Sequence, residues 1–420
     1  MKNLKTIEIG KNVNLTLIPE GKFKTNLVSV FISRKLDRDE VTKNALLPAV
    51  LKSGCSKYKT RSQLTDREEE LYGAYLNTLI SKRGENQILG FSILSVNEKY
   101  LDEKILGQSI EFLNEVINNP LVVDGGFNEE YLNVEKEIRK DIIIGIINDK
   151  ANYAVKRATE IMFEGEPYSI SGRGYVEDLD SINGVNLYEH YKKILKTSPI
   201  DIIVEGEFNE AEVVDLIKQK FTFEREEIID IPKSEYYKEV KEVKEIHETM
   251  DIAQGKLVMG YRCNVDYLDK QKYYSLLLGS KILGGGADSK LFINVREKES
   301  LCYTIYSTIQ KNKSVMFICS GIEAENYDKT ISLIKKQLQS IKDGDITETE
   351  ISNAKIGFID SLNSLNDEIG RVSDFYLSQY IAKDNSSIEE IKDMINKATK
   401  EDIVDSFKNI ELDTIYFLSK

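Results

Sequence analysis

Alternating apolar and polar side chains mark strands in the first half of the chain, and a period of three to four residues marks helices. The runs at 27–35 (LVSVFISRK), 75–83 (YLNTLISKR) and 86–96 (NQILGFSILSV) alternate and predict strands. Helices are predicted from about Lys43 and over 62–74, 102–119 and 128–149. This order, with strands in hairpin-like succession and helices between them, predicts an α+β fold.

The second half of the chain repeats this order of elements. Strands are predicted over 255–263, 302–310 and 314–322, and helices over 269–285, 291–301, 328–344 and 347–365. The stretch between the halves is charged, contains proline and has no clear apolar period, which predicts a linker. We expect domains at 1–220 and 246–420, joined by a linker at 221–245. Each domain should have a mixed, mainly antiparallel sheet with helices on one face.

Composition narrows the class of protein. The 420 residues are 41% hydrophobic and 30% charged, with a formal net charge of -13, and the Lys and Arg residues do not cluster. Nucleic-acid binding is therefore not expected. No apolar run approaches the roughly 18 residues of a membrane span, and the N-terminus has no apolar signal region. Four cysteines without CxxC spacing are typical of buried thiols in a reducing compartment, so we expect a cytoplasmic protein.

The histidine count limits catalytic chemistry. His190 and His247 are the only two histidines of the sequence. His190 lies in an amphipathic helical pattern and His247 in the charged connector, so a structural or surface role is expected for each. A zinc site built on two histidines would require these two to meet in space. A serine-type triad has the same difficulty, and the sequence contains no G-x-S-x-G elbow.

Three stretches resemble a known family. They are LGGGADSKLFINVREKESLCYTIYS at 283–307, EGEPYSISGRGYVEDLDSI at 164–182 and EELYGAYLNTL at 69–79, which contains Asn77. They resemble the M16, or insulinase-type, metallopeptidases, and specifically the two-domain subfamily that includes the mitochondrial processing peptidase. The resemblance covers nearly the whole chain and implies a LuxS/MPP-like metallohydrolase fold. It also places Asn77, Gly284 and Gly285 at a substrate chamber. Gly284 to Gly286 is not followed by a Lys-Ser/Thr pair, so we interpret it as a tight turn and not a phosphate loop.

The resemblance also implies that the zinc site has been lost. Active members carry His-x-x-Glu-His on the first long helix, where two histidines bind zinc and the glutamate is the general base. Aligned on the following LKSGC, these positions are Ala45, Pro48 and Ala49. The later glutamate ligand falls near Ile143, which indicates a helix face filled with apolar core. Glu135 and Glu137 are the alternatives if the register differs. We expect no metal on this chain.

A second pair of functional residues is retained. In active relatives an Arg and, seven residues later, a Tyr reach across the chamber to the zinc site, and here they match Arg296 and Tyr303. A guanidinium gives forked hydrogen bonds to substrate carbonyl or carboxylate groups. A tyrosine hydroxyl can donate to the oxyanion that forms when water attacks a carbonyl. The resemblance therefore implies that this pair acts in trans on a partner's zinc site.

Two functions remain open at this stage. The first is the zinc-free subunit of a heteromeric zinc peptidase, with no peptidase activity of its own. Its partner would be a zinc-bearing paralogue, its substrate a peptide, and zinc would be found only on that partner. The second is a catalytically inactive peptide-binding or scaffold protein, as a homodimer or within a complex. Family members of this zinc-less type are also associated with modification of elongation factor P. Neither function involves nucleic acid or a membrane.

Overall fold

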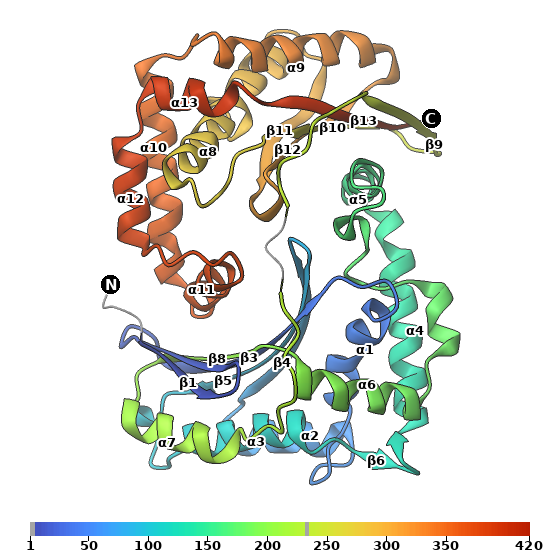
Figure 1. The fold of residues 1–420 in the computed structure, drawn as a ribbon, viewed down its shortest axis with the longest axis vertical. Coiled ribbons are helices and arrows are strands. Elements are labelled where there is room, and N and C mark those ends of the chain that lie inside the picture. The colour runs from blue at the N-terminus through green and yellow to red at the C-terminus, as the bar shows by residue number, and fades with distance from the viewer. Residues whose placement is uncertain (1–4, 232–234) are drawn as a thin grey trace.

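The computed structural model describes residues 5–231 and 235–420. The two larger of the three sheets in these residues face each other across the middle of the molecule (Figure 1). The first sheet has six strands in the order β1-β2-β8-β3-β5-β4. Its strands are β1 Lys5–Gly10, β2 Val13–Pro19, β8 Ile200–Gly206, β3 Thr25–Lys35, β5 Asn86–Val96 and β4 Tyr75–Arg83. The β2–β8 pair is parallel and the other pairs are antiparallel. Strands β4 and β5 have the bounds that the alternation predicts.

Helices of the first half, with the exception of α5, cover one face of this sheet. The helices of this half are α1 Val41–Leu51, α2 Arg61–Glu70, α3 Leu106–Asn118, α4 Glu129–Gly145, α5 Lys150–Met162, α6 Gly184–Thr197 and α7 Glu210–Lys220. A short hairpin, β6 Val122–Val123 with β7 Gly126–Phe127, lies between α3 and α4. Alternate strand residues such as Leu15, Val30 and Ile202 are buried with Leu46 of α1 and Leu113 of α3 in one core. The period-2 pattern of the strands therefore fixes which face the helices cover.

The second half has the same plan. Its five-stranded sheet has the order β11-β12-β10-β13-β9, with β9 parallel to β13 and the other pairs antiparallel. The strands are β9 Lys244–Thr249, β10 Gly255–Arg262, β11 Cys302–Gln310, β12 Val315–Ile322 and β13 Glu411–Ser419. The helices are α8 Lys270–Gly284, α9 Tyr327–Lys342, α10 Glu348–Asn363, α11 Arg371–Ile381, α12 Ile388–Lys397 and α13 Lys400–Phe407. The predicted α+β class, with mixed, mainly antiparallel sheets, is confirmed.

Each half also places one helix on the other half's sheet. Helix α5 buries Ala154, Ala158 and Met162 against the second sheet, where Val258 and Phe317 belong to the same cluster. Helix α11 does the reverse, and buries Val372 and Leu377 in a cluster that contains Ile18, Phe31 and Ile203 of the first sheet. Figure 1 shows α5 beside the upper sheet and α11 above the lower one. The exchange puts helices on both faces of each sheet, which the sequence pattern does not predict.

Buried charges join the halves beside α5. The Lys313 ammonium lies 2.8 Å from Glu85 Oε1 of the β4–β5 turn and 3.3 Å from Glu166 Oε2, which follows α5. Arg262 Nη2 lies 3.2 Å from Glu166 Oε1, and Arg262 Nε donates to Asp413 Oδ2 at 2.9 Å. Lys313 and Arg262 are each 1% exposed in their side chains. Because a buried ion left without its partner is costly, this network couples the positions of the two halves.

The end of the stretch expected as a linker belongs to a strand. Residues 232–234 of the predicted linker lie outside the described residues. The end of the stretch forms β9, which pairs with β13, so His247 lies on a strand and not in a connector as predicted. Charged side chains are common on short edge strands because they oppose pairing with another chain, and this explains why the segment looks like a linker in sequence. None of the helices in the described ranges has both the length and the apolar character needed to cross a bilayer.

Candidate functional site

Arg296 and Tyr303 lie next to each other in the second half. Arg296 belongs to a π-helical turn, η5 (Phe292–Glu297), and Tyr303 follows at the start of β11. The guanidinium carbon of Arg296 lies 5.5 Å from the ring centre of Tyr303 and 4.3 Å from that of Phe292. Tyr303 is 73% exposed and the Arg296 side chain 33%. Both groups therefore reach solvent and can contact a second molecule.

The backbone between them sets this arrangement. Ser300 has a φ of 53° and its N–H donates to the carbonyl of Arg296 at 3.0 Å, which closes a tight turn before β11. The pairing of β11 with β12 shifts between Cys302 and Thr304, so Tyr303 is the extra residue of a β-bulge. Bulges bend the strand and redirect a side chain, and they are frequent beside functional sites. The bulge and the turn together hold the Tyr303 ring beside the guanidinium.

Gly284 and Gly285 are required by close packing. A Cβ on Gly284 would lie 2.6 Å from the backbone nitrogen of Ser307 on β11, and one on Gly285 would lie 2.7 Å from the carbonyl oxygen of Lys281. Gly285 has a φ of -91°, so no positive φ requires glycine there. Both glycines stand where α8 ends and the chain turns, at the place of the expected tight turn. The absence of a side chain at Gly284 lets α8 end directly against β11, the strand that carries Tyr303.

Helix α1, which carries the positions expected for the zinc motif, is part of the core. Ala45 and Pro48 are buried and Ala49 is half-buried, and none of the three offers a metal ligand from its side chain. The helix continues from Val41 to Leu51 through Pro48. Proline lacks the N–H that a helix interior requires, so the residue weakens the helix without ending it here. No group of three or more His, Cys, Asp or Glu side chains that could hold a metal ion occurs in the described parts of the chain.

A guanidinium occupies the space beside Ala45. Arg139 of α4 donates from Nη2 to the carbonyl oxygen of Ala45 at 2.6 Å. Arg139 lies one turn before Ile143, the position that the resemblance assigns to the third zinc ligand. Burial lowers the pKa of Arg139, the expected effect of removing a cation from water. A fixed positive charge at this point disfavours a metal cation, which adds to the loss of the ligands.

The remaining candidates on α4 have structural or surface roles. Ile143 is only half-buried, and its neighbours Ile142 and Ile144 are 42% and 52% exposed. The prediction of a face filled with apolar core is therefore wrong, because α4 buries only Leu132 and Glu135 fully. Glu135 is ion-paired with Arg61 and accepts a hydrogen bond from Ser53 Oγ at 3.0 Å. Glu137 is exposed and lies 3.8 Å from Lys140.

Asn77 lies on β4, an edge strand of the first sheet, and is half-buried opposite Ser92 of β5. Arg296 and Tyr303 belong to the other half of the chain.

The structure thus brings together two pairs of residues, Arg296 with Tyr303 and Ala45 with Arg139. Arg139 was missed in the sequence reasoning, and its i, i+4 spacing to Ile143 was the only available signal.

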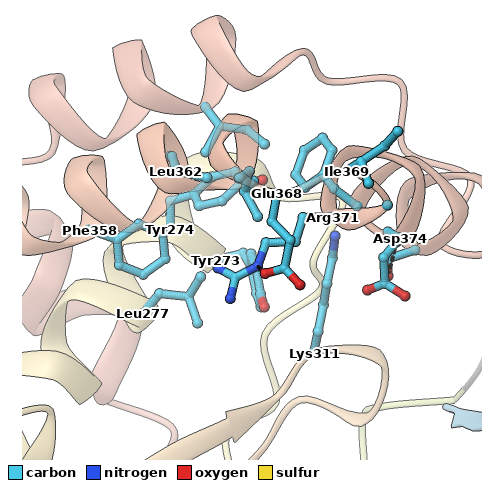
Figure 2. Close-up of a pocket in the computed structure, with 15 residues that line it drawn as sticks. Tyr273, Tyr274, Leu277, Lys311, Phe358, Leu362, Glu368, Ile369, Arg371 and Asp374 are labelled. Carbon is cyan, nitrogen blue, oxygen red and sulfur yellow. Dashed lines mark hydrogen bonds and ion pairs between the residues drawn. The ribbon is translucent and has the colours of Figure 1, made fainter. Parts of the chain in front are cut away.

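A cavity between α8, α10 and α11 is apolar on one side and charged on the other. Figure 2 shows Tyr274, Leu277, Phe358 and Leu362 on one side, and Lys311, Glu368, Arg371 and Asp374 on the other. The ionic groups already have partners within the chain. Arg371 Nε lies 2.7 Å from Glu368, Asp374 is ion-paired with Arg83, and Lys311 donates to the neutral amide of Gln379. A cavity whose ionic groups each have a partner within the chain gives no sign of a charged ligand.

His190 anchors α1 through a buried polar chain. His190 Nε2 lies 2.7 Å from Asn44 Oδ1, and Asn44 Nδ2 donates to Gln87 Oε1 at 3.0 Å. Gln87 Nε2 in turn donates to the carbonyl of Gly172 at 2.8 Å. Burial lowers the pKa of His190 to about 4, although nearby Glu40 acts in the opposite direction. His190 is thus a structural residue, as expected.

This burial predicts acid sensitivity. Unfolding lets His190 take up a proton below its ordinary pKa of about 6.5, so the contribution of His190 should lower the free energy of unfolding by about 2 kcal/mol between pH 7 and pH 5. Burial raises the pKa of Asp201 to about 7, which acts in the opposite direction over this range, so the effect of His190 is measured as a difference between proteins. In urea denaturation, His190→Gln should lack this contribution. His247→Gln, at the exposed histidine, is the matched control and should keep it. Lys193 and Arg34 hold the pKa of Glu40 at about 2, against the effect of burial. The contribution of Glu40 to the free energy of unfolding therefore falls only below about pH 4.5. Equal slopes in all three proteins would contradict the prediction.

Comparison with known proteins finds relatives in the M16 peptidase family. The family model described as "Peptidase M16 inactive domain" matches residues 181–358. A Bacillus subtilis protein, the probable inactive metalloprotease YmfF, is 33% identical over 404 residues, 96% of this chain and 94% of that protein. YmxG, an uncharacterized zinc protease of the same organism, is 25% identical over 186 residues, which are 43% of this chain and 44% of that protein.

The likeness extends to the tertiary structure. The crystal structure of a conserved protein from Enterococcus faecalis V583 matches with a TM-score of 0.91 at 31% identity, and covers 100% of this chain and 99% of that one. The similarity thus runs along nearly the whole length, through both halves and their exchanged helices. The chain belongs to the M16 metallopeptidase family.

Proposed function

We propose that this chain is the zinc-free subunit of a two-chain M16 peptidase. It pairs with a zinc-bearing M16 relative and supplies Arg296 and Tyr303 to that partner's active site. The observation that carries the proposal is the placement of these two side chains. A bulge and a tight turn hold them together at an exposed position, while the zinc positions Ala45, Pro48 and Ala49 carry no ligand.

The chemistry of the pair supports this role. A guanidinium can bind a substrate carbonyl through two parallel N–H bonds, and a neighbouring tyrosine hydroxyl can donate to the developing oxyanion. Neither group generates a nucleophile, so the pair needs a zinc-bound water from another chain. The two Bacillus subtilis relatives, one described as an inactive metalloprotease and the other as a zinc protease, supply a precedent for both types in one organism.

We place the complex in the cytoplasm. All four cysteines are free in the structure, and free thiols persist in a reducing compartment. The substrate we infer is a peptide, enclosed between the two chains.

The test is reconstitution with the M16 relative of the same organism that retains His-x-x-Glu-His. The two chains are co-expressed, purified through a tag on this chain, and analysed for mass, zinc and cleavage of an unstructured peptide. We expect about one zinc per pair and cleavage by the pair, with none by this chain alone. A metal-free homodimer that leaves the relative unbound would overturn the proposal in favour of a peptide-binding scaffold.

A further inference from the structure

A cavity lies between the first sheet and the elements that the second half places over it. Its volume is about 670 Å³, and it is lined by β1, β2 and β8 on one side and by α11 and the 384–390 segment on the other. Figure 1 shows α11 above this part of the sheet. The carboxylates on its wall are Asp201, Asp384, Glu389 and Glu390, and two tyrosines, Tyr376 and Tyr380, also line it. None of the described lining residues is Lys or Arg.

Asp201 is the unusual member of this wall. Its side chain comes from β8, a central strand, and the residue is only 6% exposed. Asn14 Nδ2 donates to Asp201 Oδ1 at 3.1 Å and contacts the Tyr380 hydroxyl at 2.9 Å. Asp201 Oδ2 is buried and has no hydrogen-bond partner among the described residues. Such an atom is costly unless something else satisfies it, and an absent ligand is one explanation.

The other carboxylates are already engaged. Asp384 lies 2.9 Å from Lys270 Nζ, and Glu389 lies 2.9 Å from Lys392 Nζ. Glu390 accepts from Ser387 at the start of α12. Asp201 has no such cation. Among the described carboxylates of the wall, only Asp201 has a buried oxygen without a hydrogen-bond partner.

We propose that this cavity binds an organic cation, a primary ammonium or guanidinium group on an alkyl chain, whose N–H groups donate to Asp201 Oδ2. The rings of Tyr376 and Tyr380 contact the alkyl chain and the cation, since tyrosine faces attract positive charge. Such a group occurs in free amines and in the lysine and arginine side chains of peptides. This site is separate from Arg296 and Tyr303 and requires no partner chain.

The protonation state of Asp201 should change when a cation binds. Burial raises the pKa of Asp201 to about 7, against the effect of its hydrogen bond from Asn14. The groups around it are Asn14 on β2, Phe31 on β3, Tyr380 on α11, and the engaged carboxylates Asp384, Glu389 and Glu390. Burial raises the pKa of Tyr380 to about 12, so this hydroxyl stays neutral. A bound cation favours the carboxylate, so binding should release a proton and tighten as the pH rises from 6 to 8.

The test is isothermal titration calorimetry of the full chain, without a partner. The probes are butylamine, butylguanidine, and blocked tripeptides Gly-Lys-Gly and Gly-Arg-Gly. We expect at least one probe to bind wild type, and Asp201→Asn to weaken it about tenfold or more, the effect of losing a charge-assisted hydrogen bond. Asp141→Asn, which removes an exposed carboxylate on α4, is the matched control and should bind as wild type. If the tripeptides bind more tightly than butylamine and butylguanidine, the ligand is a lysine or arginine side chain of a peptide. If the two small cations bind more tightly, the ligand is a free amine.

Two results would overturn the proposal. One is no binding of any probe, and the other is equal affinity in wild type and Asp201→Asn. Thermal melts followed by circular dichroism check that the variant is folded. If the variant is unfolded, wild type is titrated with the same probes at pH 7 in two buffers of different ionisation enthalpy, which measures the protons released on binding. Proton uptake, or no proton exchange, would contradict a role for Asp201. The peptidase proposal is tested on the reconstituted pair, so the two can fail separately.

Discussion

Replacing Lys313 with methionine is expected to lower the free energy of unfolding by about 3 kcal/mol. The Lys313 side chain is 1% exposed and lies between the carboxylates of Glu85 and Glu166. It also donates to the carbonyl of Glu235 at 2.6 Å. Methionine fills a similar volume with an unbranched chain, so the loss reports the missing charge and not a cavity. Glu166 keeps Arg262 and Lys238 as partners, which places the effect at the lower end of values for broken buried pairs.

Urea denaturation of the full chain measures this effect. Lys336→Met, on the exposed side of α9, is the matched control and should change stability by less than about 0.5 kcal/mol. The double variant Lys313→Met/Glu85→Gln should recover part of the loss, because one of the two carboxylates that faced Lys313 no longer carries a charge. If Lys313→Met were as stable as the control, the buried network would not join the two halves.

Replacing Tyr303 with phenylalanine is expected to reduce peptide cleavage by the reconstituted pair about 100-fold or more, with the complex intact. Phenylalanine keeps the ring beside Arg296 and removes only the hydroxyl. A hydrogen bond made only to the transition state affects kcat, so KM should change little. Size-exclusion chromatography and zinc analysis of the variant pair show whether assembly is unchanged.

Tyr306→Phe is the matched control for this experiment. Tyr306 lies three residues further along β11 and is 44% exposed, but it is outside the bulge. Its variant should cleave at the wild-type rate. Arg296→Lys keeps the positive charge but loses the forked geometry, so it should also be impaired. Full activity of Tyr303→Phe would mean that the pair is inherited from an active ancestor and is not used.

The sequence by itself determined the local elements and the residue types at the positions expected for a zinc motif. Strands β4 and β5 were predicted at their observed bounds, because the side chains of a strand alternate between the two faces of its sheet. The repeat of the two halves was visible in the order of elements for the same reason. The absence of side-chain ligands at Ala45, Pro48 and Ala49 needed no structure, since residue type alone decides whether a side chain can bind zinc.

The tertiary structure decided what depends on contacts between distant segments. An apolar helix face has the same period whichever sheet it covers, so the exchange of α5 and α11 between the halves could not be read from sequence. The guanidinium of Arg139 on the carbonyl of Ala45, and the bulge that places Tyr303 beside Arg296, depend on how chain segments meet. The same is true of Asp201. In the sequence it is one acid among many, and only the packing of α11 over β8 leaves its Oδ2 buried without a partner among the described residues.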